Sequence, residues 1–310
     1  HPWVEMDYRV IQPAFFQSKP EYSQLKEKFI DLCRKVESEP SNYYAILLMD
    51  GDQMGDLLKI YSKKVSFALA DFTQAVEEVV EQLQGVLIYA GGDDVFALFP
   101  YDQVFAAAIQ LREKYQEFFK KHVPELSCAS ISASIVLADQ KTPFQQVIPY
   151  SHHQLDQIAK EKHGRNSLVV SLYNQSGEIV HWAAPWDHAI CPTSNRTWLE
   201  ELAEHLPLSQ SYLHQCKQEL EPLSAVLPSE ELSQVAIREW ERVYQKQANS
   251  IVKEMITVLI SLGLSMRYKR EQVVEEGKVV PAENHRFQAA VARLIAWLRQ
   301  RLPQKKVVEA

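Results

Sequence analysis

The sequence predicts an α/β domain followed by an all-helical domain. Two observations lead to this division of the 310 residues. Short apolar runs of strand length alternate with helical patterns up to position 190, and beyond it only helical periodicity recurs. The loop that contains Pro185 and Pro192 marks the change. We therefore expect a lead-in segment over residues 1–40, an α/β domain over 41–190 and a helical domain over 191–310.

The composition is that of an ordinary globular protein. Apolar residues make up 46% of the chain and charged residues 24%, which excludes wholesale disorder. No apolar run approaches the roughly 18 residues of a membrane span, so we expect no membrane partner and no signal peptide. Four cysteines without a CxxC pair indicate free thiols in a reducing, cytoplasmic setting. The net charge of −7 argues against nonspecific nucleic-acid binding over the whole surface, but not against a local basic groove.

The elements of the first domain follow one another as strand, helix, strand, strand, helix, strand. The run over 43–49 is continuously apolar and has the length of a fully buried strand. Two more strands flank the connection over 91–94, whose glycines permit positive φ. This order is the βαββαβ pattern of a ferredoxin-like sheet, with helices on one face. The predicted elements after the first strand are helices over 56–84, 102–121 and 144–161 and strands over 86–90, 95–99, 129–138, 167–172 and 178–182.

Helical periodicity dominates the rest of the chain. It predicts helices over 195–206, 208–220, 229–262 and 282–301, and a short helix over 22–36 in the lead-in segment. The segment 267–270 and the last 30 residues are locally basic. Two interpretations stay open for these cations: a solvated helix face, or contact with an RNA backbone or an acidic partner subunit.

Three carboxylates stand where neighbouring strands of the predicted sheet end. Asp50 follows the first strand, and Asp93 and Asp94 lie in the hairpin turn. In a βαββαβ sheet these segments are adjacent, so the three groups should meet at one edge and raise one another's pKa values. Such a cluster suits hard divalent cations, two of which can catalyse phosphoryl transfer. The alternative is that both motifs are ordinary turns, with Asp52 as the N-cap of the following helix.

A cationic segment follows the predicted helix over 144–161. Lys160 and Lys162 precede Gly164, and Arg165 comes directly after it. One interpretation is structural, because glycine ends helices and cations favour helix C-termini. The other is functional: beside a carboxylate site, the same cations can hold the β- and γ-phosphates of a nucleoside triphosphate.

These motifs carry a resemblance to a known family. The run LMDGDQMG over 48–55, together with YAGGDDV over 89–95, resembles the palm domain of the large, polymerase-like subunit of type III CRISPR effector complexes, the type III-B form in particular. Four later motifs agree with it: AKE at 159–161, GRN at 164–166, SGE at 176–178 and WAAPW at 182–186. The resemblance covers residues 43–187, and the helical tail is similar only in placement and character.

The resemblance implies a metal-dependent nucleotidyltransferase. In that family the palm converts ATP into cyclic oligoadenylate second messengers when target RNA is bound. A 3′-hydroxyl attacks the α-phosphate of the next ATP, and pyrophosphate leaves. The resemblance implies two Mg²⁺ or Mn²⁺ ions on Asp50 and Asp93, with Asp94 beside them. It also implies other subunits of the complex as partners, and guide and target RNA reached mainly through those subunits.

Further residues are assigned by the same resemblance. The Gly51 carbonyl is implied as an additional metal ligand. Gly91 and Gly92 are implied to let the backbone approach the nucleotide closely. Lys160 and Arg165 resemble residues that bind the triphosphate.

The sequence departs from the family's pattern in three ways. Three residues, at 161–163, separate the Ala-Lys and Gly-Arg pairs, where related diguanylate cyclases usually have two. Either Lys160 or Lys162 can therefore point inward. We find neither the N-terminal His-Asp nuclease domain that members often carry, nor the second palm-like domain and zinc-bearing region of the full-length subunit. We therefore expect a fragment or a reduced form.

Two other functions remain as alternatives. One is a stand-alone palm cyclase that makes cyclic dinucleotides, and the other is a catalytically silent scaffold subunit. The intact Asp50, Asp93 and Asp94 argue against the scaffold, because like charges at one point have no structural use. The helical tail favours a subunit of a complex over the stand-alone cyclase.

Overall fold

The computed structural model describes residues 41–126, 129–265 and 287–301. The chain forms two compact units, His1–Asn42 and Tyr43–Ala310, and every element below belongs to the second. The predicted helix over 22–36 and the basic segment over 267–270 lie outside the described residues.

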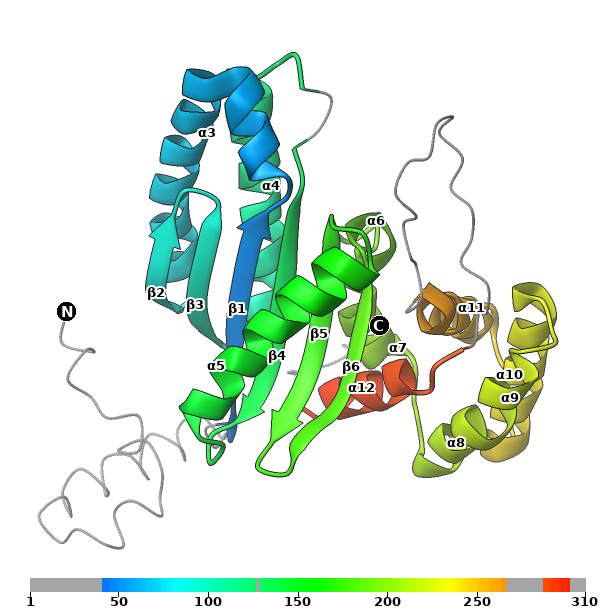
Figure 1. Ribbon diagram of the computed structural model, residues 1–310. Helices are drawn as coiled ribbons and strands as arrows, with labels where there is room; N and C mark the ends of the chain where they lie inside the picture. The colour runs from blue at the N-terminus through cyan, green and yellow to red at the C-terminus, as the bar shows by residue number, and fades with distance from the viewer. Residues whose placement is uncertain (1–40, 127–128, 266–286, 302–310) are drawn as a thin grey trace, which may run out of the picture. The chain divides into compact units, whose positions relative to one another are not determined.

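Six strands of this unit form one sheet (Figure 1). They are β1 (Tyr43–Gly51), β2 (Val86–Gly91), β3 (Asp94–Pro100), β4 (Ile131–Asp139), β5 (Ser167–Asn174) and β6 (Gly177–Pro185). Their order is β2-β3-β1-β4-β5-β6, and all neighbours are antiparallel except β4 and β5. The first four strands have the predicted ferredoxin-like arrangement, which confirms the α/β palm, and β5 and β6 extend it.

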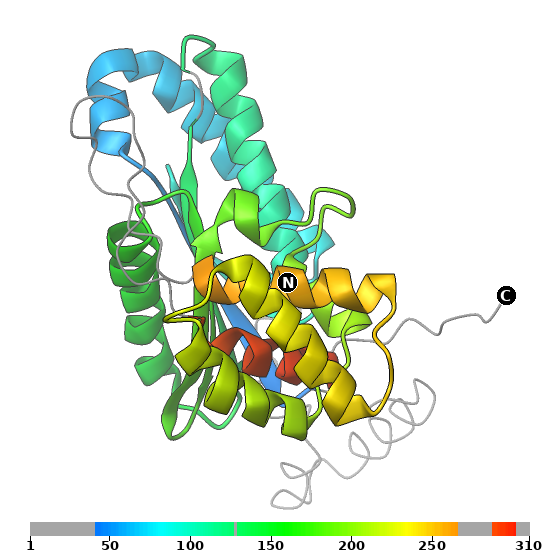
Figure 2. The ribbon, with the colours of Figure 1, turned by 90° about the vertical axis from the view of Figure 1, so that its right-hand side faces the viewer.

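Helices cover both faces of the sheet (Figure 2). They are α3 (Met54–Gln82) and α4 (Val104–His122) on one face, and α5 (Phe144–His153) and the π-helix η3 (Gln154–Lys162) on the other. Alternate residues of β1 serve the two sides: Ala45 and Leu47 pack toward α3 and α4, whereas Ile46 and Leu48 pack toward α5 and η3. The expectation of helices on one face is therefore wrong. A strand that is apolar on both sides needs cover on both sides.

The chain beyond the sheet is helical, in shorter pieces than predicted. These are α6 (Trp186–Ala189), α7 (Trp198–His205), α8 (Gln210–Gln215), η4 (Cys216–Leu220), α9 (Glu221–Leu223), α10 (Ser229–Tyr244), α11 (Ser250–Ser265) and α12 (Ala290–Arg299). The single helix predicted over 229–262 is wrong. Gln245 takes a left-handed conformation with φ 48°, and the Glu241 carboxylate accepts a hydrogen bond from the Ala248 N–H at 2.9 Å.

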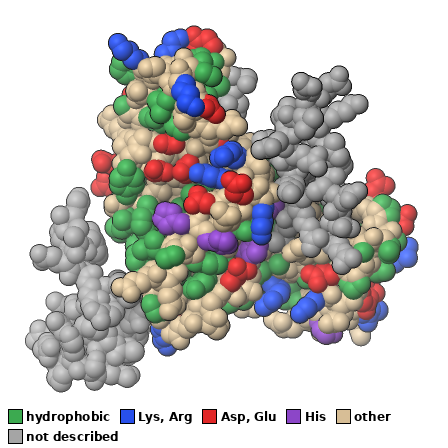
Figure 3. Space-filling model, viewed as in Figure 1, with side chains coloured by type: hydrophobic (Ala, Val, Ile, Leu, Met, Phe, Trp, Pro, Cys, Tyr) green, Lys and Arg blue, Asp and Glu red, His purple; other side chains and the backbone are tan. Residues whose placement is uncertain are grey.

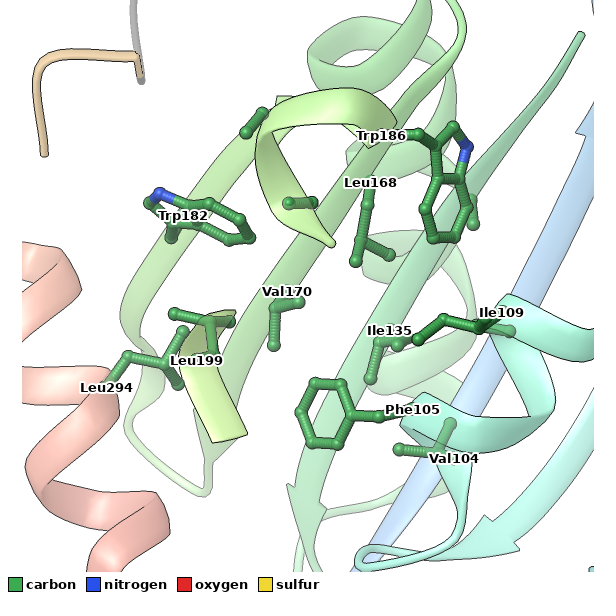
Figure 4. Packing of buried hydrophobic residues seen from close by; sticks show 14 of the residues in the cluster. Val104, Phe105, Ile109, Ile135, Leu168, Val170, Trp182, Trp186, Leu199 and Leu294 are labelled. Atoms are coloured by element: carbon green, nitrogen blue, oxygen red, sulfur yellow. The ribbon is translucent and has the colours of Figure 1, made fainter. Parts of the chain in front are cut away.

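One continuous apolar core joins the sheet to these helices. Figure 4 shows side chains of α4, of β4, β5 and β6, and of α7 and α12 pointing into the same cluster. Two buried indoles add polar links: Trp182 donates to the Leu262 carbonyl at 3.1 Å, and Trp186 donates to the Ile131 carbonyl at 2.8 Å. The helices thus stabilise the sheet directly. The predicted domain boundaries, at 40 and near 190, stay a prediction.

The structure also bears on two expectations from the composition, free cysteines and the absence of a membrane-spanning segment. Cys191 and Cys216 are free, buried thiols, while Cys33 and Cys128 lie outside the described residues. Among the helices that the structure describes, none combines the length and the hydropathy needed to cross a membrane.

Candidate functional site

The end of β1 and the β2–β3 hairpin lie side by side. In the antiparallel register Met49 pairs with Val95, so the next position on each side is Asp50 on β1 and Asp94 on the hairpin. Asp93 precedes Asp94 in the turn between Gly91 and Asp94 that closes the hairpin. The structure thus brings together the three carboxylates that the sequence placed at one sheet edge.

These carboxyl groups are partly desolvated and repel one another. Loss of hydration and the charge of Asp50 raise the pKa of Asp94 to about 6, and a hydrogen bond with Asp50 and the charge of Asp93 act in the same direction. Desolvation, followed by the charge of Asp50, also raises the pKa of Asp93. Asp94 keeps contact with solvent, which screens part of these interactions. A cation placed among them would be strongly favoured.

Lys160 supplies such a cation. Its Nζ lies 2.5 Å from Asp50 Oδ1 and 3.9 Å from Asp156 Oδ1, and its side chain is only 12% exposed. Lys162, two residues further on, is exposed to solvent. Of the two lysines that the sequence left open, Lys160 therefore faces the carboxylates. Figure 3 shows acidic and basic side chains gathered on this face of the molecule.

A wide helical turn carries Lys160 to this place. The π-helix η3 contains it, and the His163 N–H closes the last turn on the Ile158 carbonyl at 3.0 Å. A π-turn absorbs one additional residue inside a helix. It therefore accommodates the third residue between the Ala-Lys and Gly-Arg pairs. The predicted helix over 144–161 is correct in extent, but its second half is not α-helical.

The chain leaves η3 through three successive residues with positive φ. These are Gly164, Arg165 and Asn166, at 71°, 70° and 47°. The Arg165 N–H donates to the Ala159 carbonyl at 3.1 Å, and the Arg165 carbonyl accepts from Ser167 Oγ at 2.7 Å. Within the described ranges no ion pair joins the Arg165 guanidinium to the acidic cluster, so its role toward phosphate stays a prediction.

Asp52 is buried beneath the site and does not cap a helix. Its carboxylate accepts three hydrogen bonds, each at 2.8 Å, from Ser130 Oγ, Ser132 Oγ and the Asn166 backbone N–H. Gln53 stands at the N-cap position of α3, so the prediction for Asp52 is wrong. Three hydrogen bonds to the carboxylate stabilise this buried position more than a single capping hydrogen bond would. They also tie the end of β1 to β4 and to the turn after η3, which holds Asp50 and Lys160 in place.

Glycine is required where the backbone comes closest to the site. A Cβ on Gly51 would lie 2.5 Å from Tyr115 Oη and 2.7 Å from Asp93 Cβ. A Cβ on Gly91 would collide with the side chain of the nearby tyrosine on β2, and Gly92 has φ 66°. The three glycines implied by the resemblance therefore have conformational or steric reasons for being glycine. Tyr115 is a member of the site that the sequence did not reveal, because it stands on an apolar helix face like a core residue.

The donor set is one that hard divalent cations prefer, because it consists of carboxylate oxygens. In the part of the chain that the structure describes, however, no three Asp, Glu, His or Cys side chains stand ready as metal ligands. Mg²⁺ commonly uses one or two carboxylates and completes its shell with water and substrate phosphate. Asp50 and Asp93 fit that pattern. Metal binding by Asp50, Asp93 and Asp94 stays a prediction.

Comparisons with known proteins find similarity to subunits of CRISPR systems. The family described as "Cas10/Cmr2, second palm domain" matches residues 43–169. The CRISPR system Cmr subunit Cmr2 of Pyrococcus furiosus is 29% identical over 206 residues, which cover 55% of this chain and 23% of that protein. The CRISPR system single-strand-specific deoxyribonuclease Cas10/Csm1 (subtype III-A) of Mycobacterium tuberculosis is 31% identical over 87 residues, 28% of this chain and 10% of that protein. The chain thus spans less than a quarter of the length of these relatives.

A solved structure supports the fold. The apo state of a Type III-B Cmr-beta complex, solved by cryo-electron microscopy, contains a chain that matches 88% of this one and 40% of its own length, with a TM-score of 0.51 and 14% identity. The expected resemblance is confirmed, with one refinement: the palm in this chain corresponds to the second of the family's palm domains. Residues 43–169 are therefore similar to the second palm domain of Cas10/Cmr2 proteins.

Proposed function

We propose that this chain is the nucleotidyltransferase part of a type III CRISPR effector subunit and that it converts ATP into cyclic oligoadenylates. The observation that carries the proposal is the meeting of Asp50, Asp93 and Asp94 with Lys160 at the edge of a Cas10/Cmr2 palm. Two relatives are named as parts of CRISPR systems, one of them as a subunit, which supports other subunits as partners. Guide RNA, target RNA and a cytoplasmic location are parts of the same proposal.

The carboxylates are the proposed cation site. Asp50 and Asp93 would hold two Mg²⁺ or Mn²⁺ ions, with Asp94 beside them and the Gly51 carbonyl as a further ligand. In the proposed reaction a 3′-hydroxyl attacks the α-phosphate of ATP and pyrophosphate leaves. Ions bound at this site would stabilise the negative charge that develops on the phosphate oxygens.

Lys160 is the proposed partner of the triphosphate. In the free chain its ammonium group neutralises Asp50. When a nucleotide brings its own cations to the carboxylates, this ammonium is released toward the β- and γ-phosphate oxygens, to which it donates charge-assisted hydrogen bonds. Arg165 is the second proposed phosphate ligand. Since Gly91 and Gly92 lack side chains, the hairpin backbone can approach the nucleotide closely.

The buried Asp52 carboxylate gives the site its rigidity. Because it binds donors from β4 and from the turn after η3, the elements that carry Asp50 and Lys160 cannot drift apart without breaking those bonds. A preorganised site loses little free energy in aligning its groups with the reacting phosphate.

The test is product analysis. The chain is incubated with ATP, GTP and Mg²⁺ or Mn²⁺, alone and after assembly with sister subunits, guide RNA and target RNA, and the products are identified by mass spectrometry. Cyclic oligoadenylate that requires the complementary target supports the proposal. Cyclic dinucleotides made by the isolated chain would identify a stand-alone cyclase instead. Nucleotide binding without any product in the complete complex would identify a silent scaffold.

A further inference from the structure

Tyr115 of α4 combines a tightly packed ring with an unsatisfied hydroxyl. The residue is 0% exposed, and its ring contacts Phe72 edge-on at 5.1 Å and Phe119 at 4.6 Å between centroids. The hydroxyl oxygen is also buried, and it has no hydrogen-bond partner among the residues that the structure describes. A buried polar group without a partner is destabilising, and phenylalanine would fill the same aromatic cluster without that cost. Packing alone therefore does not account for the hydroxyl.

The hydroxyl lies beside the acidic cluster. Tyr115 Oη lies 2.5 Å, and Asp93 Oδ2 3.0 Å, from the point where a Cβ on Gly51 would stand, so both oxygens border the bare backbone of this glycine. In the free chain the Asp93 carboxylate is held by its own backbone N–H. Burial, and after it the charges of Asp93, Asp52 and Asp50, raise the pKa of Tyr115 far above its usual range, so the phenol stays protonated.

A neutral donor next to a carboxylate cluster has a definite use. It can donate one hydrogen bond to an ionised carboxylate without adding charge, which orients that carboxylate and leaves its second oxygen for another partner. We propose that the Tyr115 hydroxyl positions the Asp93 carboxylate, by donating a hydrogen bond to it once Asp93 turns from its own backbone to a nucleotide-bound cation. This inference rests on the proposed function, since it assigns Asp93 to cation binding. Tyr115 is a positioning residue: it acts through Asp93.

The decisive variant is Tyr115→Phe, which removes only the oxygen atom. Binding of ATP with Mn²⁺ to the full chain is measured by calorimetry, and the melting temperature is measured in EDTA. The expected result is an affinity about tenfold weaker, as for loss of a hydrogen bond to a charged group. The melting temperature should be unchanged or higher, because an unsatisfied hydroxyl has been removed.

Tyr212→Phe is the matched control. Tyr212 is equally buried, but its hydroxyl donates to the Ala236 carbonyl at 3.0 Å, far from the site in the sequence and in the fold. Its loss should lower the melting temperature and leave the affinity for ATP with Mn²⁺ unchanged. The two variants are therefore expected to show opposite effects on the same two measurements.

Asp93→Asn separates failure of this inference from failure of the proposed function. If Asp93→Asn binds ATP with Mn²⁺ as tightly as the original chain, the proposed function fails and the inference fails with it. If Asp93→Asn loses affinity while Tyr115→Phe does not, only the role of Tyr115 is overturned. A fall in melting temperature for Tyr115→Phe as large as that for Tyr212→Phe would also overturn it, because the hydroxyl would then be structural.

Discussion

The ammonium nitrogen of Lys160 lies 2.5 Å from a carboxylate oxygen of Asp50, although the two residues belong to elements remote in the sequence. Asp50 is at the end of β1 and Lys160 is in the π-helix η3. The pair is partly shielded from water, with the lysine side chain 12% exposed and the aspartate side chain 30% exposed. Removing one partner of such a pair leaves the other charge poorly compensated. The contact joins the carboxylates to one of the two lysines for which the resemblance left a phosphate-binding role open.

The first prediction concerns this lysine. Lys160→Ala should weaken ATP binding by about 1–3 kcal/mol, because a charge-assisted contact to phosphate is lost. The affinity for ADP should fall less than the affinity for ATP. Lys162→Ala is the control, since Lys162 is exposed and should leave the affinity unchanged. Calorimetric titration measures the affinities for ATP, ADP and adenosine. If adenosine lost as much affinity as ATP, the effect of Lys160→Ala would be structural.

The second prediction concerns the hairpin carboxylates. Asp93→Asn combined with Asp94→Asn should abolish nucleotide polymerisation and leave the fold intact, because cation ligands are lost while like charges are removed. In EDTA the melting temperature should stay the same or rise. Product formation is followed by mass spectrometry and stability by calorimetry. Full activity of the double variant would disprove the site assignment, and a large drop in melting temperature would favour an ordinary structural turn.

The third prediction is a pH dependence of stability in the absence of metal. The pKa of Asp94 is about 6 in the folded chain, whereas an unfolded chain has about 3.9. Between these values the folded state binds more protons, so the free energy of unfolding should fall as the pH rises from about 4 to about 6. The raised pKa of Asp93 acts in the same direction.

Asp94→Asn provides the comparison for this pH dependence. The variant should be more stable than the original chain at pH 7, and the difference should shrink toward pH 4, where the aspartic acid is protonated in the folded state and about half protonated in the unfolded chain. Melting temperatures in EDTA across this range measure it. Parallel curves for the two proteins would contradict the assigned interactions of Asp94.

Much of the palm could be predicted because its signals are local. The apolar run of β1 and the glycine-rich connection before Asp94 each specify one element, and the βαββαβ order then places Asp50 beside the hairpin. The second covered face was missed, although β1 is apolar on both sides. Its cover comes from α5 and η3, which follow later in the chain, and a helix pattern does not say which face of a sheet it will join.

The remaining features depend on tertiary contacts. The break at Gln245 involves neither glycine nor proline, and the local signal near it is Asn249, whose Oδ1 accepts a hydrogen bond from the Val252 N–H at 2.9 Å at the start of α11. The role of Asp52 depends on donors from β4 and from the turn after η3, which only the folded sheet brings near. The choice of Lys160 depends on a π-turn, which has no simple sequence signature.

The last prediction separates a subunit of an RNA-guided complex from an autonomous cyclase. The net charge of −7 opposes direct capture of RNA, and the basic residues near the end of the chain offer only a local exception. We therefore expect weak RNA binding by the isolated chain, and RNA should act mainly through partner subunits. ATP should nevertheless bind to the isolated chain, because Asp50 and the hairpin carboxylates belong to one sheet.

Synthesis should then depend on assembly rather than on ATP binding. Target RNA can activate the palm only if it binds more tightly to a catalytically competent arrangement than to an inactive one. The increase in synthesis rate is therefore bounded by the difference between these two affinities. We expect low basal synthesis by the isolated chain and a higher initial rate after assembly with guide RNA, sister subunits and a complementary target, at equal ATP. A non-complementary target is the control, and it should leave the rate at its basal value. If the isolated chain already runs at the assembled rate and target RNA changes nothing, control by RNA is disproved and the palm acts as an autonomous cyclase.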